Sequence, residues 1–282
     1  MNQIKVSSGI VIGADHVRIK KNCQDALLVV EKQDLLVAVV GDGMGDPIDS
    51  LHAEVGSTIG VTAIANYIAG RLESAPKWKW NSMLRGRELW EETQKHTLNL
   101  IESTSHAMGG SYSRAIIKHF LFTIVGMVVT PEITLFFGTG DGNYFLNGQM
   151  YEMFAKDVDN MPPCLAYNLV GTTSKRLTTE DLRLRVRHAV STKTVQSAMI
   201  ATDGIEWFLK DPTKIVPGTR NPVGGPEDFW SNKEYFENTE ALGWRLNLLA
   251  TEKKRIDWAV SEMETQPAIL KDDLAVVVVS RL

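Results

Sequence analysis

The chain has 282 residues, of which 44% are hydrophobic and 23% charged, and its formal net charge is −4. This composition is typical of a soluble globular protein, and the slightly acidic balance gives no electrostatic case for binding nucleic acid or an anionic membrane. No apolar run reaches the roughly 18 residues that span a bilayer, and the first residues lack the apolar segment of a signal peptide. Cys23 and Cys164 make no disulfide framework. We therefore expect a cytoplasmic protein.

Apolar runs rich in β-branched residues predict strands along most of the chain. In chain order they span residues 8–13, 26–31, 35–41, 120–129, 132–138, 143–147, 149–154, 197–202 and 274–280. Pro131 and the pair Asn147-Gly148 stand between successive runs and favour tight turns. These turns indicate antiparallel hairpins.

Three further stretches have the periodicity of helices. The first, from Ser50 to Ala69, is apolar almost all round, as in a well-buried helix. The second follows Pro76, and the third has a four-three apolar spacing from Leu242 to Met263. The Pro- and Gly-rich segment 211–236 is either a lid or a surface excursion.

Short strands framed by an early and a late helical block predict an α+β fold, in which two packed antiparallel β-sheets are flanked by helices. The expected architecture is a four-layer αββα sandwich. We expect residues 1–282 to form it as a single domain, since a chain of this length can bury a sizeable core.

Aspartates recur at the ends of the predicted strands. Asp42, Asp141 and Asp203 each follow an apolar run and precede a glycine, and Asp272-Asp273 comes just before the last run. Carboxylates at strand ends can converge on one rim of a sheet, where they repel one another unless a cation lies between them. Asp-Gly is also a common turn sequence, but its repetition favours a metal site. The six histidines contain no His-x-x-x-His pair, so a helical zinc site is not supported and each histidine is expected at the surface or in local hydrogen bonds.

Taken in order, these motifs resemble those of the metal-dependent serine/threonine protein phosphatases of type 2C. The matching segments are Asn22-Cys23-Gln24-Asp25, Gly41-Asp42-Gly43-Met44-Gly45, Gly140-Asp141-Gly142-Asn143, Thr202-Asp203-Gly204 and Asp272-Asp273. Each motif alone is weak, but five in the family's order over nearly the whole chain are specific. The family fold is itself a β-sandwich between two helical layers, which agrees with the architecture predicted above.

The resemblance implies a site for two Mn²⁺ or Mg²⁺ ions, which prefer oxygen ligands. Asp42 would bridge both ions, the Gly43 carbonyl would bind one, and Asp203 and Asp272 would hold the other. Asp25 would anchor its ion largely through water. A metal-bound water would then attack phosphorus, and the serine or threonine oxygen would leave without a protein nucleophile. Catalysis is thus implied to depend on Asp42, Asp203 and Asp272.

The chain departs from the family pattern at several positions. Gln24 replaces a glutamate ligand of some members, and Met44 replaces a histidine proposed to protonate the leaving group, although methionine cannot transfer a proton. Asp141 is retained and would hold a third, weaker ion with Asp203, but Gly142-Asn143 replaces the usual serine and arginine. The family's phosphate-binding arginine is not clearly present, and Lys20 is its best positional match.

Three hypotheses on function follow. The first is an active enzyme that hydrolyses phosphoserine and phosphothreonine in phosphoprotein substrates. The second is a catalytically weak regulatory relative that binds a protein partner through the same fold. The third is an unrelated β-sandwich whose aspartates are only turn residues. The complete set of Asp25, Asp42, Asp203 and Asp272 favours the enzyme, because clustered carboxylates without a metal would be costly. The sequence leaves open the target, the leaving-group acid and the oligomeric state.

Overall fold

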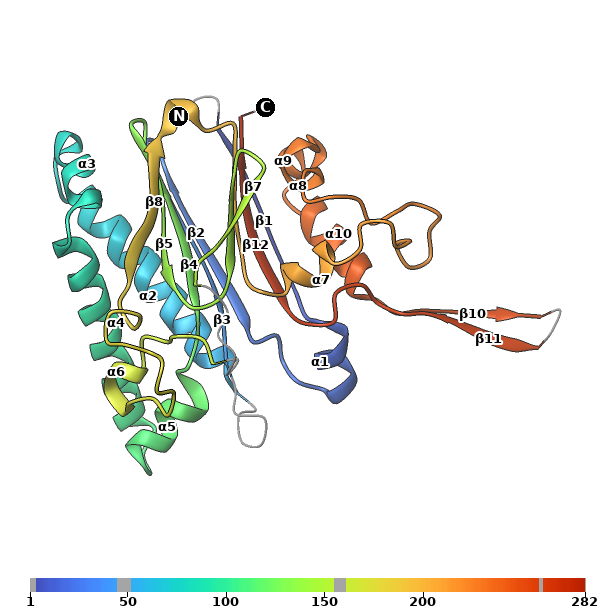
Figure 1. The fold of residues 1–282 in the computed structure, drawn as a ribbon, viewed down its shortest axis with the longest axis horizontal. Helices are drawn as coiled ribbons and strands as arrows, with labels where there is room; N and C mark the ends of the chain where they lie inside the picture. The colour runs from blue at the N-terminus through green and yellow to red at the C-terminus, as the bar shows by residue number, and fades with distance from the viewer. Residues whose placement is uncertain (1–3, 45–51, 155–160, 259–260, 282) are drawn as a thin grey trace.

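The fold is built on two five-stranded antiparallel sheets that pack face to face (Figure 1). It was obtained as a computed structural model, which describes residues 4–44, 52–154, 161–258 and 261–281. One sheet has the order β2-β3-β4-β5-β8, with bounds Asp25–Lys32, Leu35–Asp42, Ile124–Val129, Ile133–Thr139 and Arg185–Ser191. The other has the order β1-β12-β9-β6-β7, with bounds Lys5–Val11, Leu274–Ser280, Ser197–Ala201, Asn143–Leu146 and Gln149–Glu152.

Helices cover the outer face of each sheet, so the molecule has four layers (Figure 1). Beside the first sheet lie α2 (Glu54–Glu73), α3 (Lys77–Arg85), α4 (Glu88–Ala107), α5 (Tyr112–His119) and α6 (Tyr167–Val170). Beside the second lie α7 (Ile205–Leu209), α8 (Asp228–Ser231), α9 (Glu234–Glu237) and α10 (Ala241–Ala250). The predicted α+β class with two packed antiparallel sheets between helices is confirmed.

The alternation of side chains along the strands determines which residues reach the site. In β3, Val37 and Val39 pack with the helices, whereas Ala38 and Val40 face the second sheet. Asp42 has the same parity as Ala38 and Val40, so it ends β3 on the inner side of its sheet. By the same alternation, Asp25 takes the inward-facing side at the start of β2.

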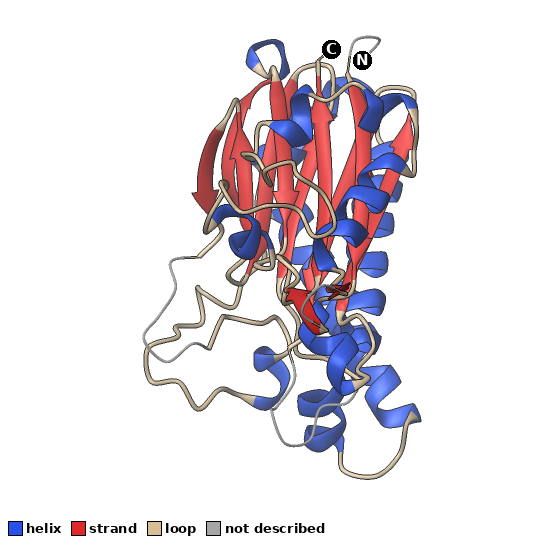
Figure 2. Ribbon diagram, turned by 90° about the vertical axis from the view of Figure 1, so that its right-hand side faces the viewer, coloured by secondary structure: helices blue, strands red, loops and turns tan. Residues whose placement is uncertain are grey.

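The strand ends that carry these acids lie together at one end of the sandwich. Irregular segments extend beyond that end of the sheets, as Figure 2 shows. A short helix, α1 (Ala14–Ile19), follows β1 there and has no buried residue. Among the described residues, none of the helices has the length and hydrophobicity that a transmembrane segment requires.

The third predicted helix was wrong beyond residue 250. The chain there forms a two-stranded hairpin, β10 (Lys253–Asp257) and β11 (Glu262–Gln266), which extends away from the sandwich (Figure 1). Ile256 pairs directly with Met263 across this hairpin. The seven-residue separation of these two apolar residues fits two turns of a helix equally well, which explains the mistaken prediction.

Other elements also differ from the prediction. Strand β8 and the helices α1 and α5 were not predicted, and β4 begins at Ile124 rather than at residue 120. The segment 211–236 contains α8 and the start of α9, and it buries Val216, Val223 and Phe229 in the core beside the second sheet. None of its residues lines the cavity described below, which favours a surface excursion over a lid. The first residues of the helix predicted from Ser50 lie outside the described part of the chain.

Candidate active site

A cavity of about 680 Å³ opens at the end of the sandwich where the aspartates gather. One set of lining residues is polar: His16, Gln24, Asp42, Asp141, Asp203 and Asp272. A second set is apolar: Met44, Ile117, Leu121, Met161, Pro162 and Tyr167. Gly43, Gly171, Thr172 and Thr173 are the other described residues of the lining. The structure thus brings together five of the six predicted metal ligands, from four separate motifs, in one cavity.

The sixth predicted ligand, Asp25, lies directly beside Asp42. The two residues are paired in register where β2 begins and β3 ends. Asp25 is only 5% exposed, and one of its oxygens accepts a hydrogen bond of 2.6 Å from the Thr202 hydroxyl. Two carboxyl groups on neighbouring strands are therefore held at the same end of one sheet.

Burial and mutual repulsion act on both carboxyl groups. Burial raises the pKa of Asp25 well above its usual value, as do the nearby Asp273, Asp203 and Asp272, against the opposing effect of the Thr202 hydrogen bond. Burial also raises the pKa of Asp42 well above its usual value, together with Asp25, Asp203, Asp141 and Asp272. Such a set of oxygen donors suits a hard divalent cation, which would remove the repulsion. The residues present therefore fit a Mg²⁺ or Mn²⁺ site.

We expect the stability of the metal-free protein to fall as the pH rises above about 4. The carboxyls of Asp25 and Asp42 keep their protons to higher pH in the folded chain than in the unfolded chain, because their pKa values are raised. The free energy of unfolding therefore falls as the pH rises from the ordinary carboxyl pKa to the raised values. Above the raised values it no longer changes through these two groups. Mn²⁺ should reverse the trend, adding about 2.7 kcal/mol at a hundred times its Kd.

Thermal unfolding between about pH 5 and pH 8, with chelator and with Mn²⁺, measures this effect. Asp42→Asn is the informative control, since it should flatten the slope of the chelated protein. If the chelated protein instead becomes more stable as the pH rises over this range, the pKa values of Asp25 and Asp42 are not raised in the folded state.

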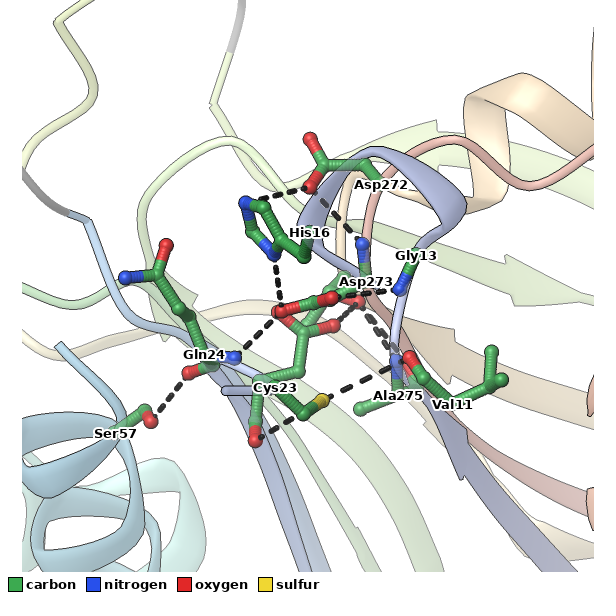
Figure 3. A network of polar contacts seen from close by, with 11 residues as sticks. Val11, Gly13, His16, Cys23, Gln24, Ser57, Asp272, Asp273 and Ala275 are labelled. Carbon is green, nitrogen blue, oxygen red and sulfur yellow. Dashed lines mark hydrogen bonds and ion pairs between the residues drawn. The ribbon is translucent and has the colours of Figure 1, made fainter. Parts of the chain in front are cut away.

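The adjacent acids Asp272 and Asp273 have different surroundings (Figure 3). Asp273 is 2% exposed and accepts hydrogen bonds from the backbone N–H of Gly13 at 2.7 Å and of Gln24 at 2.5 Å. His16 Nδ1 lies 2.9 Å from the same carboxylate. Asp272 has a side chain 51% exposed and lines the cavity. Asp273 thus connects the segment before β12 to the residues that follow β1 and precede β2. Asp272 is available to a ligand.

His16 is a residue of this site that the sequence did not reveal. It lies in α1, with Nε2 3.9 Å from Asp272, and its contact with the Asp273 carboxylate raises its pKa. His16, Asp272 and Asp273 are the one group of three potential metal ligands found within 4.8 Å of one another in the described ranges. Sequence spacing gave no signal, because the residues meet only when β1 and β12 pair.

Two glycines allow the terminal acidic segment to approach the other motifs. A Cβ atom on Gly13 would lie 2.2 Å from the backbone carbon of Asp272, and one on Gly204 would lie 1.9 Å from the Asp273 carbonyl oxygen. Neither contact is possible without movement of the backbone. The glycine after Asp203 is therefore required by close packing against the segment that carries Asp272.

We expect Gly204→Ala to displace the Asp272-Asp273 segment, because the added methyl group would overlap its backbone. The substitution should lower the free energy of unfolding by about 1–3 kcal/mol and weaken Mn²⁺ binding. Gly70→Ala is the matched control, because a Cβ atom there meets nothing within 4 Å and α2 should gain stability. Equal melting temperatures and metal affinities for the two variants would contradict the packing argument.

The remaining predicted site residues have distinct positions. Gly43 lines the cavity, and Met44 beside it has its sulfur 3.4 Å from the Cys164 sulfur. Lys20 is exposed at the C-terminal cap of α1 and is not among the described cavity residues. No lysine or arginine is found among the described residues that line the cavity. The role of Lys20 in binding phosphate stays a prediction without support from this geometry.

A sandwich of two antiparallel sheets between helices, with clustered carboxylates at one end of its strands, defines an αββα fold with a candidate metal site. The sequence family described as Protein phosphatase 2C matches residues 12–240, and the chain belongs to this family. Among curated proteins, no sequence matches the chain significantly. The hairpin β10–β11 and the Asp272-Asp273 motif lie beyond the matched range.

Solved structures of bacterial phosphatases share this fold. The serine/threonine phosphatase Stp1 from Staphylococcus aureus aligns over 98% of this chain and 94% of its own, with 11% identity and a TM-score of 0.52. The S. agalactiae serine/threonine phosphatase aligns over 99% and 100%, with 13% identity and a TM-score of 0.51. The catalytic domain of the serine/threonine protein phosphatase PstP, solved with two manganese ions, aligns over 98% and 97%, with 12% identity and a TM-score of 0.50.

The family assignment supports the first of the three hypotheses and excludes the third. It confirms the resemblance to type 2C phosphatases and the class of enzyme, a protein serine/threonine phosphatase. The hypothesis of an unrelated sandwich with ordinary Asp-Gly turns is wrong.

Proposed function

We propose that the protein hydrolyses phosphoserine and phosphothreonine in phosphoproteins, using a water activated by two divalent cations, Mn²⁺ or Mg²⁺. The observation that carries this proposal is the in-register pair of Asp25 and Asp42, which lies beside Asp203 and Asp272 at one cavity. The two manganese ions in the related PstP catalytic domain support the proposed number of core ions.

The residues of the site would have the following roles. When bound, two divalent cations lower the pKa of a shared water and neutralise the phosphate charge. Asp42, the Gly43 carbonyl, Asp203 and Asp272 would hold the two ions, with the Asp42 carboxylate contributing to both. Asp25, held by the Thr202 hydroxyl, would orient water around its ion. Each of these groups lines the cavity or directly adjoins a residue that does.

Asp141 also lines the cavity and contributes to the raised pKa of Asp42. With Asp203 it would hold a third ion more weakly, since fewer protein ligands are available there.

A cysteine nucleophile is not supported. Burial raises the pKa of Cys164 well above its usual value, and the nearby Asp141 and Asp42 raise it further. Such a thiol is not a nucleophilic thiolate at neutral pH. Met44, in the position of the family's leaving-group acid, cannot transfer a proton, so a water molecule or another residue would have to supply the proton.

Turnover of a phosphothreonine peptide and of a small aryl phosphate tests this function. We expect hydrolysis of both with Mn²⁺ or Mg²⁺ and none after chelation. Absence of metal-dependent turnover on both substrates would overturn the proposal and leave the regulatory hypothesis, which no specific contact here favours. A single domain and a cytoplasmic location stay predictions from the sequence.

A further inference from the structure

The side chain of Gln24 is buried at the cavity, and its amide nitrogen has no hydrogen-bond partner in the part of the chain that the structure describes. Gln24 is 6% exposed and lines the cavity together with Asp42 and Gly43. Its Nε2 atom has no partner among the described residues. Figure 3 shows the side chain directed away from the contacts around Asp273. A buried amide donor that is left unpaired is costly, which points to a ligand that accepts from it.

Both backbone polar groups of Gln24, its N–H and its carbonyl, are hydrogen-bonded. Its N–H donates to the Asp273 carboxylate at 2.5 Å, and its carbonyl accepts from the Ser57 hydroxyl at 2.6 Å and from the Gly43 N–H at 3.0 Å. These contacts join β2 to α2, β3 and the segment before β12. Because the backbone is held in place and the side chain itself is buried, the Gln24 amide loses less freedom on binding a ligand than an exposed glutamine would.

The charge of the cavity explains why a neutral donor suits this place. Four aspartates line the cavity, and its described lining contains no lysine or arginine. A cationic side chain beside Asp42 or Asp203 would form an ion pair with the carboxylate and compete with a divalent metal ion. An amide donates a hydrogen bond to an oxyanion without this competition.

We infer that the Gln24 amide donates a hydrogen bond to a phosphoryl oxygen of the bound phosphate ester. This inference rests on the proposed phosphatase function. It assigns to Gln24 the binding of substrate phosphate for which Lys20 was predicted, since Lys20 is outside the described cavity lining. The competing role for Gln24 is to bind metal or metal-bound water through Oε1, because rotation of the amide exchanges its oxygen and nitrogen.

Two substitutions separate these roles. Gln24→Leu removes the donor at similar size, and Gln24→Glu replaces it with a carboxylate that repels phosphate and attracts a cation. Gln196→Glu, on an exposed residue outside the cavity lining, is the control for the same charge change. For each variant the measurements are KM and kcat with an aryl phosphate, the inhibition constant of inorganic phosphate, and Mn²⁺ affinity by calorimetry.

If Gln24 binds phosphate, both substitutions raise KM and the phosphate inhibition constant about tenfold or more. Gln24→Leu keeps its Mn²⁺ affinity, and Gln196→Glu changes nothing. Unchanged phosphate affinity in Gln24→Leu overturns the inference, as does a loss of Mn²⁺ binding by that variant. If the wild-type protein has no turnover, calorimetric binding of inorganic phosphate to the Mn²⁺-loaded protein still tests Gln24 separately from the proposed function.

Discussion

Replacing Asp42 with asparagine is expected to abolish metal-dependent turnover and to lower metal occupancy at both core positions. One carboxylate at the end of β3 would serve both ions, and it adjoins Asp25 in register. Asparagine offers one neutral oxygen in place of a shared charge, so neither ion keeps its full set of ligands. A loss of several kcal/mol of transition-state stabilisation lowers the rate about a thousandfold or more.

Calorimetric Mn²⁺ titration beside turnover of an aryl phosphate measures both effects. Asp34→Asn is the matched control, because Asp34 lies at the other end of the β2–β3 hairpin and pairs only with exposed Lys77 among the contacts described. Chelated Asp42→Asn should also be more stable than the chelated wild type at neutral pH, because a partly desolvated carboxylate that its neighbours repel is removed. A variant that binds two ions tightly and turns over normally would make Asp42 an ordinary turn residue.

Asp272→Asn and Asp273→Asn are expected to affect different properties of the protein, the first its metal binding and turnover and the second its stability. Asp272 lines the cavity with a half-exposed side chain, so its loss should weaken one ion and lower turnover by orders of magnitude while the fold persists. Asp273 accepts backbone hydrogen bonds from Gly13 and Gln24 in a buried position. Its replacement should lower the free energy of unfolding by about 1.5–3 kcal/mol, since an asparagine amide would meet one of these donors.

Urea unfolding and turnover of the folded protein distinguish the two variants. Asp273→Asn, assayed where it is fully folded, should keep more activity than Asp272→Asn. The reverse order would mean that the ligand in the terminal motif is Asp273, one residue away from the proposed position.

Strands with a continuous apolar sequence were readily predicted. Strand β3 is covered on both faces, by helices through Val37 and Val39 and by the second sheet through Ala38 and Val40, so nearly every residue is apolar. Strand β8 is an edge strand that alternates Arg185, Val186, Arg187 and His188, and a search for apolar runs overlooks it. Helix α1 has no buried residue and therefore no apolar stripe to detect.

Most of the acidic part of the site was visible in the sequence, because Asp42, Asp141 and Asp203 each follow a predicted strand and precede a glycine, and Asp272-Asp273 comes just before the last strand. The buried amide of Gln24 and the ring of His16 were recognisable only in three dimensions. Their positions depend on pairing between the two ends of the described chain, and no local pattern records that pairing.

The pairing of β1 with β12 has a consequence for synthesis of the protein. The hydrogen bond from Gly13 to Asp273 joins residues 260 positions apart, and β12 is also the partner of β9. Contacts of such long range make folding slow, because a large loop must close before they form. A growing chain carries Asp25 and Asp42 early, but Asp272 and the strand β12 that follows it are synthesised more than about 200 residues later. The unfinished chain therefore cannot assemble the site, and it should release no phosphate before β12 has been made.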